Sequence, residues 1–165
     1  MTDFGKNTHC SRCGSKFDRL SWPRKCVRCE LEVFQNPLPV AIAMVPVDSG
    51  ILVVRRAIEP DIGFLALPGG YINLGESWEE AVSRELSEET GICFSPDDVS
   101  LFDVRLSRNK THLLIFGAFK GITGDLLPEW QPNEECSERL IVSPDEIYWA
   151  THAETAKKFL STRRP

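Results

Sequence analysis

The 165-residue chain lacks an apolar run of the roughly 20 residues that a helix needs to cross a bilayer. Its longest apolar segment, residues 40–47, has the length of a β-strand and contains Pro46. The first ten residues contain neither the basic nor the apolar segment of a secretory leader. We therefore expect a cytoplasmic protein that has no membrane partner.

Positive charge is also in short supply, with 19 Lys and Arg residues against 24 Asp and Glu residues and a net charge of −5. Broad binding to nucleic acid requires basic residues that neutralise many phosphates, so nucleic acid is not an expected partner. A small phosphorylated molecule stays compatible with this charge, because a divalent cation can supply local positive charge. The apolar fraction of 42% and the charged fraction of 26% are typical of a soluble domain.

Four of the six cysteines form two pairs with identical spacing: Cys10 with Cys13, and Cys26 with Cys29. Two such turns can present four thiolates to a tetrahedral Zn²⁺, and four protein ligands leave no open position for catalysis. Two disulfides or four unrelated thiols are the alternatives, which the lack of a leader disfavours. We therefore expect a structural zinc site, and we expect the isolated Cys93 and Cys136 to be buried.

Residues 1–36 contain few aliphatic side chains and cannot bury enough apolar surface to fold without such a cross-link. Two prolines in residues 35–39 favour extended backbone and indicate a boundary. The predicted domains are a small zinc ribbon over 1–36 and a second domain over 37–165.

The second domain alternates irregularly between strand and helix patterns. The predicted strands lie at 40–47, 51–56, 64–67, 101–106, 113–120 and 138–142, the first two forming a hairpin around a turn at 48–50. The predicted helices are residues 77–90, a short one beginning at 143–145, and residues 151–160. This order favours an α/β fold with a mixed sheet flanked by helices over a doubly wound parallel sheet.

The helix at 77–90 has carboxylates on its apolar side. At about 100° per residue, an apolar arc forms from Trp78, Val82 and Leu86, with Ala81 at its edge. The opposite, solvated side is predicted to hold Glu79, Glu80, Ser83, Ser87 and Thr90. Glu85 and Glu89 fall within the apolar arc and Glu88 on its margin, although a carboxylate is disfavoured there unless its charge is compensated.

These three glutamates are three or four residues apart, so their side chains converge on one patch. Converging carboxylates require either raised pKa values or a cation, and hard oxygen ligands suit Mg²⁺ or Mn²⁺. Arg84 can pair with Glu80 or Glu88, or reach back to Glu76. The alternative is a Glu-rich surface helix with Glu–Arg pairs, which leaves Glu85 and Glu89 unexplained.

Residues 70–92 match a known motif at every defined position. The motif is the Nudix box, G-x5-E-x7-R-E-U-x-E-E-x-G-U with U an aliphatic residue, and the matching positions are Gly70, Glu76, Arg84, Glu85, Leu86, Glu88, Glu89, Gly91 and Ile92. On these residues, the chain from about Pro39 to Leu160 is similar to the Nudix hydrolase family. Residues 66–70 also resemble the strand and turn that precede the box in that family.

The resemblance implies an α/β/α sandwich and a Mg²⁺- or Mn²⁺-dependent hydrolase. In such an enzyme, metal-activated water attacks one phosphorus of a diphosphate in a nucleoside diphosphate derivative. By position, Glu85 and Glu89 are the implied metal ligands, and Glu88 is a further ligand or the base. The Gly70 carbonyl would complete the ligand set, while Arg84 and Glu76 would hold the loop and the helix together. The resemblance also allows a homodimer.

Other residues have weaker signals. Many members of the family take a further carboxylate from a later loop, which makes Glu134 and Glu135 candidates for base or ligand, although an ordinary solvated loop explains them equally well. Arg55 and Arg56 are candidates for binding a phosphate, with simple surface charge as the alternative. Candidate walls for a nucleobase or flavin, any of which core packing would also explain, are Phe64, Tyr71, Phe116 and Trp130.

A zinc ribbon joined to such a domain resembles two groups within the family. The NADH pyrophosphatases, which also remove NAD caps from RNA, carry a Ser-Gln-Pro-Trp-Pro-Phe-Pro-x-Ser array that residues 93–120 lack. A shorter group acts on FAD and ADP-ribose, and the short chain favours it. The rival interpretations are a non-catalytic Nudix domain that binds or regulates, a nucleic-acid-binding protein acting through its ribbon, and a hydrolase of nucleoside triphosphates.

Overall fold

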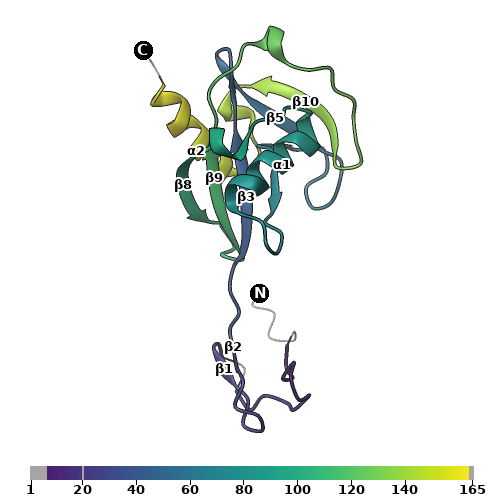
Figure 1. Cartoon of the computed structure of the whole chain (residues 1–165), viewed down its shortest axis with the longest axis vertical. Helices are drawn as coiled ribbons and strands as arrows, with labels where there is room; N and C mark the ends of the chain where they lie inside the picture. The colour runs from purple at the N-terminus through teal and green to yellow at the C-terminus, as the bar shows by residue number, and fades with distance from the viewer. Residues whose placement is uncertain (1–6, 20, 164–165) are drawn as a thin grey trace. The chain divides into compact units, whose positions relative to one another are not determined.

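The computed structural model describes residues 7–19 and 21–163, and it divides the chain into two compact units between Asn36 and Pro37 (Figure 1). The segment on which the expectation of no leader partly rests, residues 1–6, lies outside the described residues. Neither α-helix in the described part combines the length and the apolarity that crossing a bilayer demands.

The first unit is built around its cysteines. Strands β1 (Arg24–Lys25) and β2 (Glu32–Val33) pair antiparallel, and the buried apolar residues are Cys10, Phe17 and Cys26. Such a small core offers far less apolar burial than an independent domain needs, so the four-cysteine cluster is the main candidate for holding this unit together.

The second unit contains two four-stranded sheets. In the first, β3 (Leu38–Met44) runs parallel to β9 (His112–Ala118) and antiparallel to β7 (Gly69–Tyr71), and β8 (Ser100–Leu106) pairs with the far edge of β9. This sheet is mixed, as predicted. In the second sheet, β5 (Gly50–Arg56) pairs antiparallel with the strands β4 (Pro46–Val47), β6 (Leu65–Ala66) and β10 (Cys136–Val142).

The predicted hairpin between 40–47 and 51–56 is largely wrong. Only the two residues of β4 pair with β5, whereas β3 pairs with β7 and β9 in the other sheet. The chain passes from one sheet to the other near Pro46, and both neighbouring segments are buried. Two apolar strands that are adjacent in sequence therefore have the pattern of a hairpin, although they belong to different sheets.

Alternate residues of β3 pack into two different cores. Ala41 and Ala43 share a core with Val82 and Leu86 of α1 (Trp78–Thr90). On the other face, Ile42 and Met44 share a core with Ala156 and Phe159 of α2 (Ala150–Ser161), as expected for strand side chains that alternate between faces. The strands thus lie between two helices, and the predicted α/β/α sandwich is confirmed (Figure 1).

Three single-turn 3-10 helices complete the unit: η1 (Pro96–Asp98), η2 (Gly124–Leu126) and η3 (Pro144–Glu146). The last of these replaces the short helix predicted from residue 143.

Helix α1 begins and ends as predicted. Ser77 accepts a hydrogen bond from the Glu80 amide in a capping box, and Gly91 ends the helix with a left-handed φ of 73°. Glu85 and Glu89 are buried, as the helical pattern indicates. The assignment of Ser83 and Thr90 to a solvated side is wrong, because both are buried.

The chain that follows the helix also packs against its core. Ile92 belongs to the same core as α1, and Phe94 packs against that core. The burial of Thr90 costs little, because its hydroxyl donates to the Leu86 carbonyl and accepts from the Ile92 amide.

Candidate metal centres

The two buried carboxylates of α1 face the glycine pair of β7. The Gly69 amide donates to Glu89 Oε2 at 3.0 Å. A β-carbon added to Gly70 would lie 2.3 Å from Glu85 Oε1, which is closer than any real contact. Glycine at 70 therefore leaves the space that the Glu85 carboxylate occupies, and β7 fixes this space by pairing with β3.

Burial makes both carboxylates difficult to ionise. Glu89 is 6% exposed, and its burial raises its pKa to about 8, with the charges of Glu85 and Glu135 adding to the rise. Glu85 is 8% exposed, and burial raises its pKa too, opposed by the adjacent Arg84. A nearby cation offsets the cost of burying a carboxylate charge, and carboxylate oxygens are the ligands that hard divalent metal ions prefer, so the donor set fits such an ion.

Arg84 joins the preceding loop to the helix. Its guanidinium donates twice to Glu76, at 2.7 and 3.0 Å, and to the Tyr71 carbonyl at 3.0 Å. The same guanidinium donates to Glu85 at 2.7 Å and to Glu88 at 3.0 Å. Hydrogen bonding to Arg84 lowers the pKa of Glu76, so that carboxylate stays ionised. Pairing of Arg84 with Glu88 and Glu76 is as predicted, whereas Glu80 instead accepts from the Ser77 amide.

The glutamates do not gather into one tight cluster. Within 7–19 and 21–163, the cysteines alone bring three or more ligand atoms within 4.8 Å of one another. Glu85 and Glu88 share Arg84, whereas Glu89 turns towards the Gly69 amide. Mutual repulsion favours this spread, in which Glu89 takes a donor of its own and the Arg84 guanidinium offsets the charges of Glu85 and Glu88. The residues that could hold a divalent cation are Glu85, Glu89 and the Gly70 carbonyl, with Glu88 exposed at their edge.

The last turn of α1 carries no basic side chain of its own. Its carbonyls instead receive hydrogen bonds from a distant segment: Trp130 Nε1 donates to Glu89 O at 2.9 Å, Asn133 Nδ2 to Glu88 O at 2.9 Å, and Arg139 Nη1 to Thr90 O at 2.6 Å. Sequence reasoning missed these contacts, since no local pattern relates the three side chains to a helix far back in the chain. They hold this segment against the last turn of α1, which carries Glu88 and Glu89.

The structure distinguishes the two glutamates of that loop. The charge of Glu135 contributes to the raised pKa values of Glu85, Glu89 and Cys136, and the Glu135 carbonyl accepts from the Ala57 amide at 2.7 Å. Both side chains are exposed, but Glu134 is not among the main causes of these shifts. Of the pair, Glu135 is therefore the better candidate for an additional ligand or base.

Arg55 and Arg56 are already engaged with the loop at 57–64. Arg55 donates to Glu138 at 2.6 Å and to the Gly63 carbonyl at 2.8 Å. Arg56 donates to the Pro60 carbonyl at 2.8 Å and lies over the Trp149 ring at 5.1 Å. Both side chains thus fix a loop, which weakens their candidacy as free phosphate ligands.

The aromatic candidates have different environments. Phe116 is fully buried core, and Trp130 bonds the end of α1. Phe64 stacks on Tyr148 with ring centroids 3.8 Å apart, and both rings are about half exposed. Tyr71 is also exposed, with its hydroxyl 3.1 Å from His112 Nε2. Of the four candidates, Phe64 and Tyr71 are the two with exposed rings.

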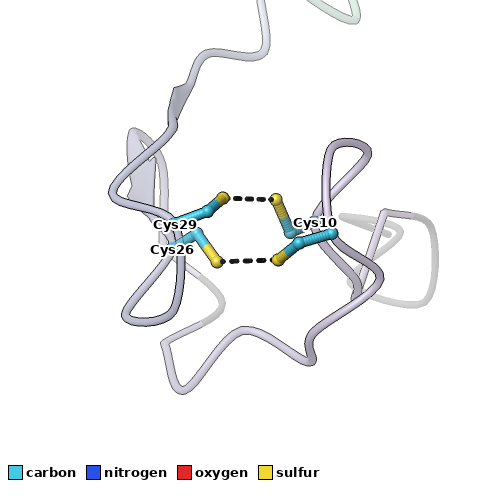
Figure 2. Close-up of side chains that lie close together, drawn as sticks. Cys10, Cys26 and Cys29 are labelled. Atoms are coloured by element: carbon cyan, nitrogen blue, oxygen red, sulfur yellow. Dashed lines mark hydrogen bonds between the residues drawn. The ribbon is translucent and has the colours of Figure 1, made fainter.

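In the first unit, the four cysteine sulfurs lie within 4.8 Å of one another. Cys10 Sγ is 3.6 Å from Cys29 Sγ, and Cys13 Sγ is 3.6 Å from Cys26 Sγ. Within each pair, the two sulfurs point towards each other (Figure 2). Tetrahedral zinc with bonds of about 2.3 Å spaces its sulfurs by roughly 3.8 Å, so the arrangement fits Zn²⁺.

The isolated cysteines differ from each other. Cys136 is buried, as predicted, and its burial raises the pKa of its thiol to about 12. The prediction that Cys93 is buried is wrong: its thiol is exposed at the end of α1, 3.3 Å from the Ser87 hydroxyl.

Comparison with known proteins gives a family match. The model of the NUDIX domain matches residues 37–162. The chain is 40% identical over 60 residues to an ADP-ribose pyrophosphatase of Methanocaldococcus jannaschii, covering 36% of each protein. It is 31% identical over 87 residues to the NAD-capped RNA hydrolase NudC of Haemophilus influenzae, covering 50% of this chain and 33% of that one. The matched segment thus spans about a third of the length of each of these relatives.

Solved structures share the fold. A NUDIX hydrolase from Nitrosomonas europaea superposes with a TM-score of 0.71 at 19% identity, covering 94% of this chain and 92% of that one. A bifunctional NMN adenylyltransferase/ADP ribose pyrophosphatase from Francisella tularensis, complexed with AMP and a Mn ion, gives 0.64 at 23% identity, covering 78% and 42%. At these identities, the likeness is one of fold alone.

Proposed function

Because the chain belongs to the NUDIX domain family, we propose that it is a hydrolase that uses Mg²⁺ or Mn²⁺ to cleave the diphosphate of a nucleoside diphosphate derivative. The observation that carries this proposal is the pair of buried carboxylates, Glu85 and Glu89, held against Gly69 and Gly70. Burial raises the pKa of both carboxylates, and a bound divalent cation would offset the buried charge, to which Arg84 is a partner at Glu85 alone.

Each residue of the site has a distinct task in the proposed reaction. Glu85, Glu89 and the Gly70 carbonyl would hold a divalent cation, which neutralises diphosphate charge and lowers the pKa of water. Arg84 keeps Glu85 in place by anchoring it, through Glu76, to the loop before the helix. Glu88 or Glu135 would accept the proton of the attacking water, because both are exposed at the edge of the site.

ADP-ribose is the substrate that we propose first, and FAD second. The relative from Methanocaldococcus jannaschii, named as an ADP-ribose pyrophosphatase, supports the first choice. The exposed ring of Phe64, stacked on Tyr148, offers a surface for a nucleobase. The competing proposal is NADH, NAD or an NAD-capped RNA, which the similarity to NudC supports and the missing array after the box opposes.

For the first unit, we propose that Cys10, Cys13, Cys26 and Cys29 bind one structural Zn²⁺. The spacing of the sulfurs supports this, and four protein ligands leave no position for substrate. We propose that the chain has two domains, the zinc ribbon at 1–36 and the hydrolase domain at 37–165.

A turnover screen tests the proposed function. The zinc-loaded protein is assayed with Mg²⁺ and then Mn²⁺ against ADP-ribose, FAD, NADH, NAD and nucleoside triphosphates. We expect release of AMP from ADP-ribose, reduced at least about 100-fold in Glu89→Gln. Glu79→Gln is the matched control, since Glu79 lies in the first turn of the same helix, away from the site.

The other outcomes are equally informative. A preference for NADH or NAD would move the chain to the competing substrate class. If a folded protein turned over none of these compounds yet bound ADP-ribose in a calorimetric titration, the non-catalytic binding module would replace the hydrolase.

A further inference from the structure

Asn133 connects two segments through a single side chain. Its Oδ1 accepts from the backbone amide of Glu135 at 3.0 Å and from that of Cys136 at 2.8 Å. The backbone amide of Asn133 donates to the Cys136 carbonyl at 2.9 Å. These bonds close a tight turn over 133–136. The Nδ2 of the same side chain donates to the Glu88 carbonyl at 2.9 Å, in the last turn of α1.

The turn holds the backbone of Glu135 from both sides. The Glu135 amide is bound to Asn133, and its carbonyl accepts from the Ala57 amide at the end of β5. Cys136, the next residue, is buried and begins β10. The backbone of Glu135 is therefore held in a turn that Asn133 ties to the last turn of α1, where Glu88 and Glu89 lie.

We propose that Asn133 is a positioning residue: it ties the last turn of α1 to the turn at 133–136, so that the Glu135 carboxylate faces the divalent cation together with Glu85 and Glu89. The inference rests on the proposed function, because it gives Asn133 a task in that site. Neither the Nudix box nor the acidic character of the loop singles out this residue.

Trp130 makes a neighbouring contact that allows the proposed positioning role of Asn133 to be separated from simple capping of α1. Trp130 Nε1 donates to the Glu89 carbonyl at 2.9 Å, so Trp130 and Asn133 each satisfy one carbonyl in the same turn of the helix. In the described part of the chain, the indole makes no hydrogen bond to the turn at 133–136. Trp130→Phe therefore removes a helix cap alone, whereas Asn133→Ala removes a cap and the link to Glu135.

The experiment compares four variants of the full chain: Asn133→Ala, Trp130→Phe, Glu135→Gln and the double variant Asn133→Ala/Glu135→Gln. We expect Asn133→Ala to lower kcat by roughly 10-fold or more and to raise the Mg²⁺ concentration for half-maximal activity, as Glu135→Gln does, with KM changed less than about twofold. We expect the double variant to be no worse than Glu135→Gln, because the two residues act through one carboxylate.

Three results would overturn the inference: equal losses in Trp130→Phe and Asn133→Ala, full additivity of the double variant, or a loss expressed in KM alone. Should Asn133→Ala fail to fold, Asn133→Asp takes its place. The aspartate keeps the acceptor for the two turn amides and loses the donor to Glu88, so we expect the same fall in kcat.

Failure of the proposed function can be told apart from failure of this inference. If the wild-type protein turns over no substrate, Mn²⁺ binding to the zinc-loaded chain is measured by calorimetry. Weaker binding in Asn133→Ala and Glu135→Gln than in Trp130→Phe would uphold the positioning role without the hydrolase. Unchanged Mn²⁺ affinity in Asn133→Ala would refute it.

Discussion

Gly70 and Glu85 occupy adjoining space so closely that a β-carbon on the glycine would approach Glu85 Oε1 to 2.3 Å. Gly70→Ala should therefore displace the Glu85 carboxylate and weaken both cation binding and turnover, by roughly 10- to 100-fold as for other residues that orient metal ligands. The Mn²⁺ dissociation constant and kcat measure this effect. Gly121→Ala is the control, because the nearest atom to its new methyl group is the flexible end of Arg163, at 3.1 Å. An alanine at 70 with wild-type Mn²⁺ affinity would contradict the proposed ligand set.

Glu89→Gln should stabilise the protein at alkaline pH when no divalent cation is added. The folded pKa of Glu89, about 8, lies above its ordinary value of 4.5, so the folded chain keeps a proton that the unfolded chain releases. The contribution of Glu89 to the free energy of unfolding is thus fully present below pH 4.5 and is lost as the pH rises towards 8. The total loss is at most about 5 kcal/mol, because each pKa unit corresponds to about 1.4 kcal/mol.

Urea unfolding at pH 6 and pH 8 checks this prediction. We expect the glutamine variant to have the higher midpoint at pH 8, and added Mg²⁺ to raise the midpoint of the wild type alone. A glutamine variant less stable than the wild type at pH 8 without cation would show that the buried charge is already compensated within the chain.

His152 should give the opposite pH dependence. It is buried between Phe116 and Trp149, its Nδ1 has no hydrogen-bond partner, and burial lowers its pKa to about 3. In the unfolded chain His152 is protonated as the pH falls below about 6.5, whereas in the folded chain it stays neutral. The contribution of His152 is therefore fully present above pH 6.5 and is lost as the pH falls towards 3, by at most about 1.4 kcal/mol per pH unit.

The measurement is the free energy of unfolding of the wild type and of His152→Phe between pH 7.5 and pH 4.5. Phenylalanine keeps a ring in the cavity and cannot be protonated, so the variant should lose less stability over this interval. Parallel curves for the two proteins would mean that His152 becomes charged in the folded state at ordinary pH.

Removal of zinc should unfold the first unit and leave the second intact. The buried residues of the first unit are few, whereas the second has two extensive cores of its own. We expect one zinc per chain by elemental analysis, lost in Cys26→Ser and retained in Cys93→Ser, whose thiol is exposed and outside the cluster. Hydrogen exchange should show loss of protection confined to residues 7–33; retention of zinc by Cys26→Ser would refute the four-cysteine site.

Features specified by neighbouring residues could be predicted from the sequence. Ser77 and Gly91 mark the two ends of α1 through their own capping geometry, and Glu85 and Glu89 stand out because a helix has a fixed period. The cysteine pairs are equally local, since each turn sets the spacing of its two sulfurs.

Features that depend on distant segments could not be predicted. The helical period does not indicate that Ser83 is buried, and the partners of Arg55 are a loop carbonyl and a strand far along the chain. The hydrogen bond from Asn133 to Glu88 spans two segments that no periodicity connects. Strand pairing failed for a related reason: two adjacent apolar runs do not reveal that they enter different sheets.

The strand register has a consequence for how this chain acquires its fold. Leu38 at the start of β3 pairs with His112 of β9, and Ile51 of β5 pairs with Val142 of β10, so both sheets join strands that lie far apart in the sequence. Non-local pairing of this kind slows folding, because the chain loses the entropy of loop closure before the stabilising contacts between the strands can form. Helix α1 leaves the ribosome well before its sheet is complete, and its glutamates are then still in water. The burial of these glutamates, which raises their pKa values, therefore belongs to the assembled sheets and not to the isolated helix.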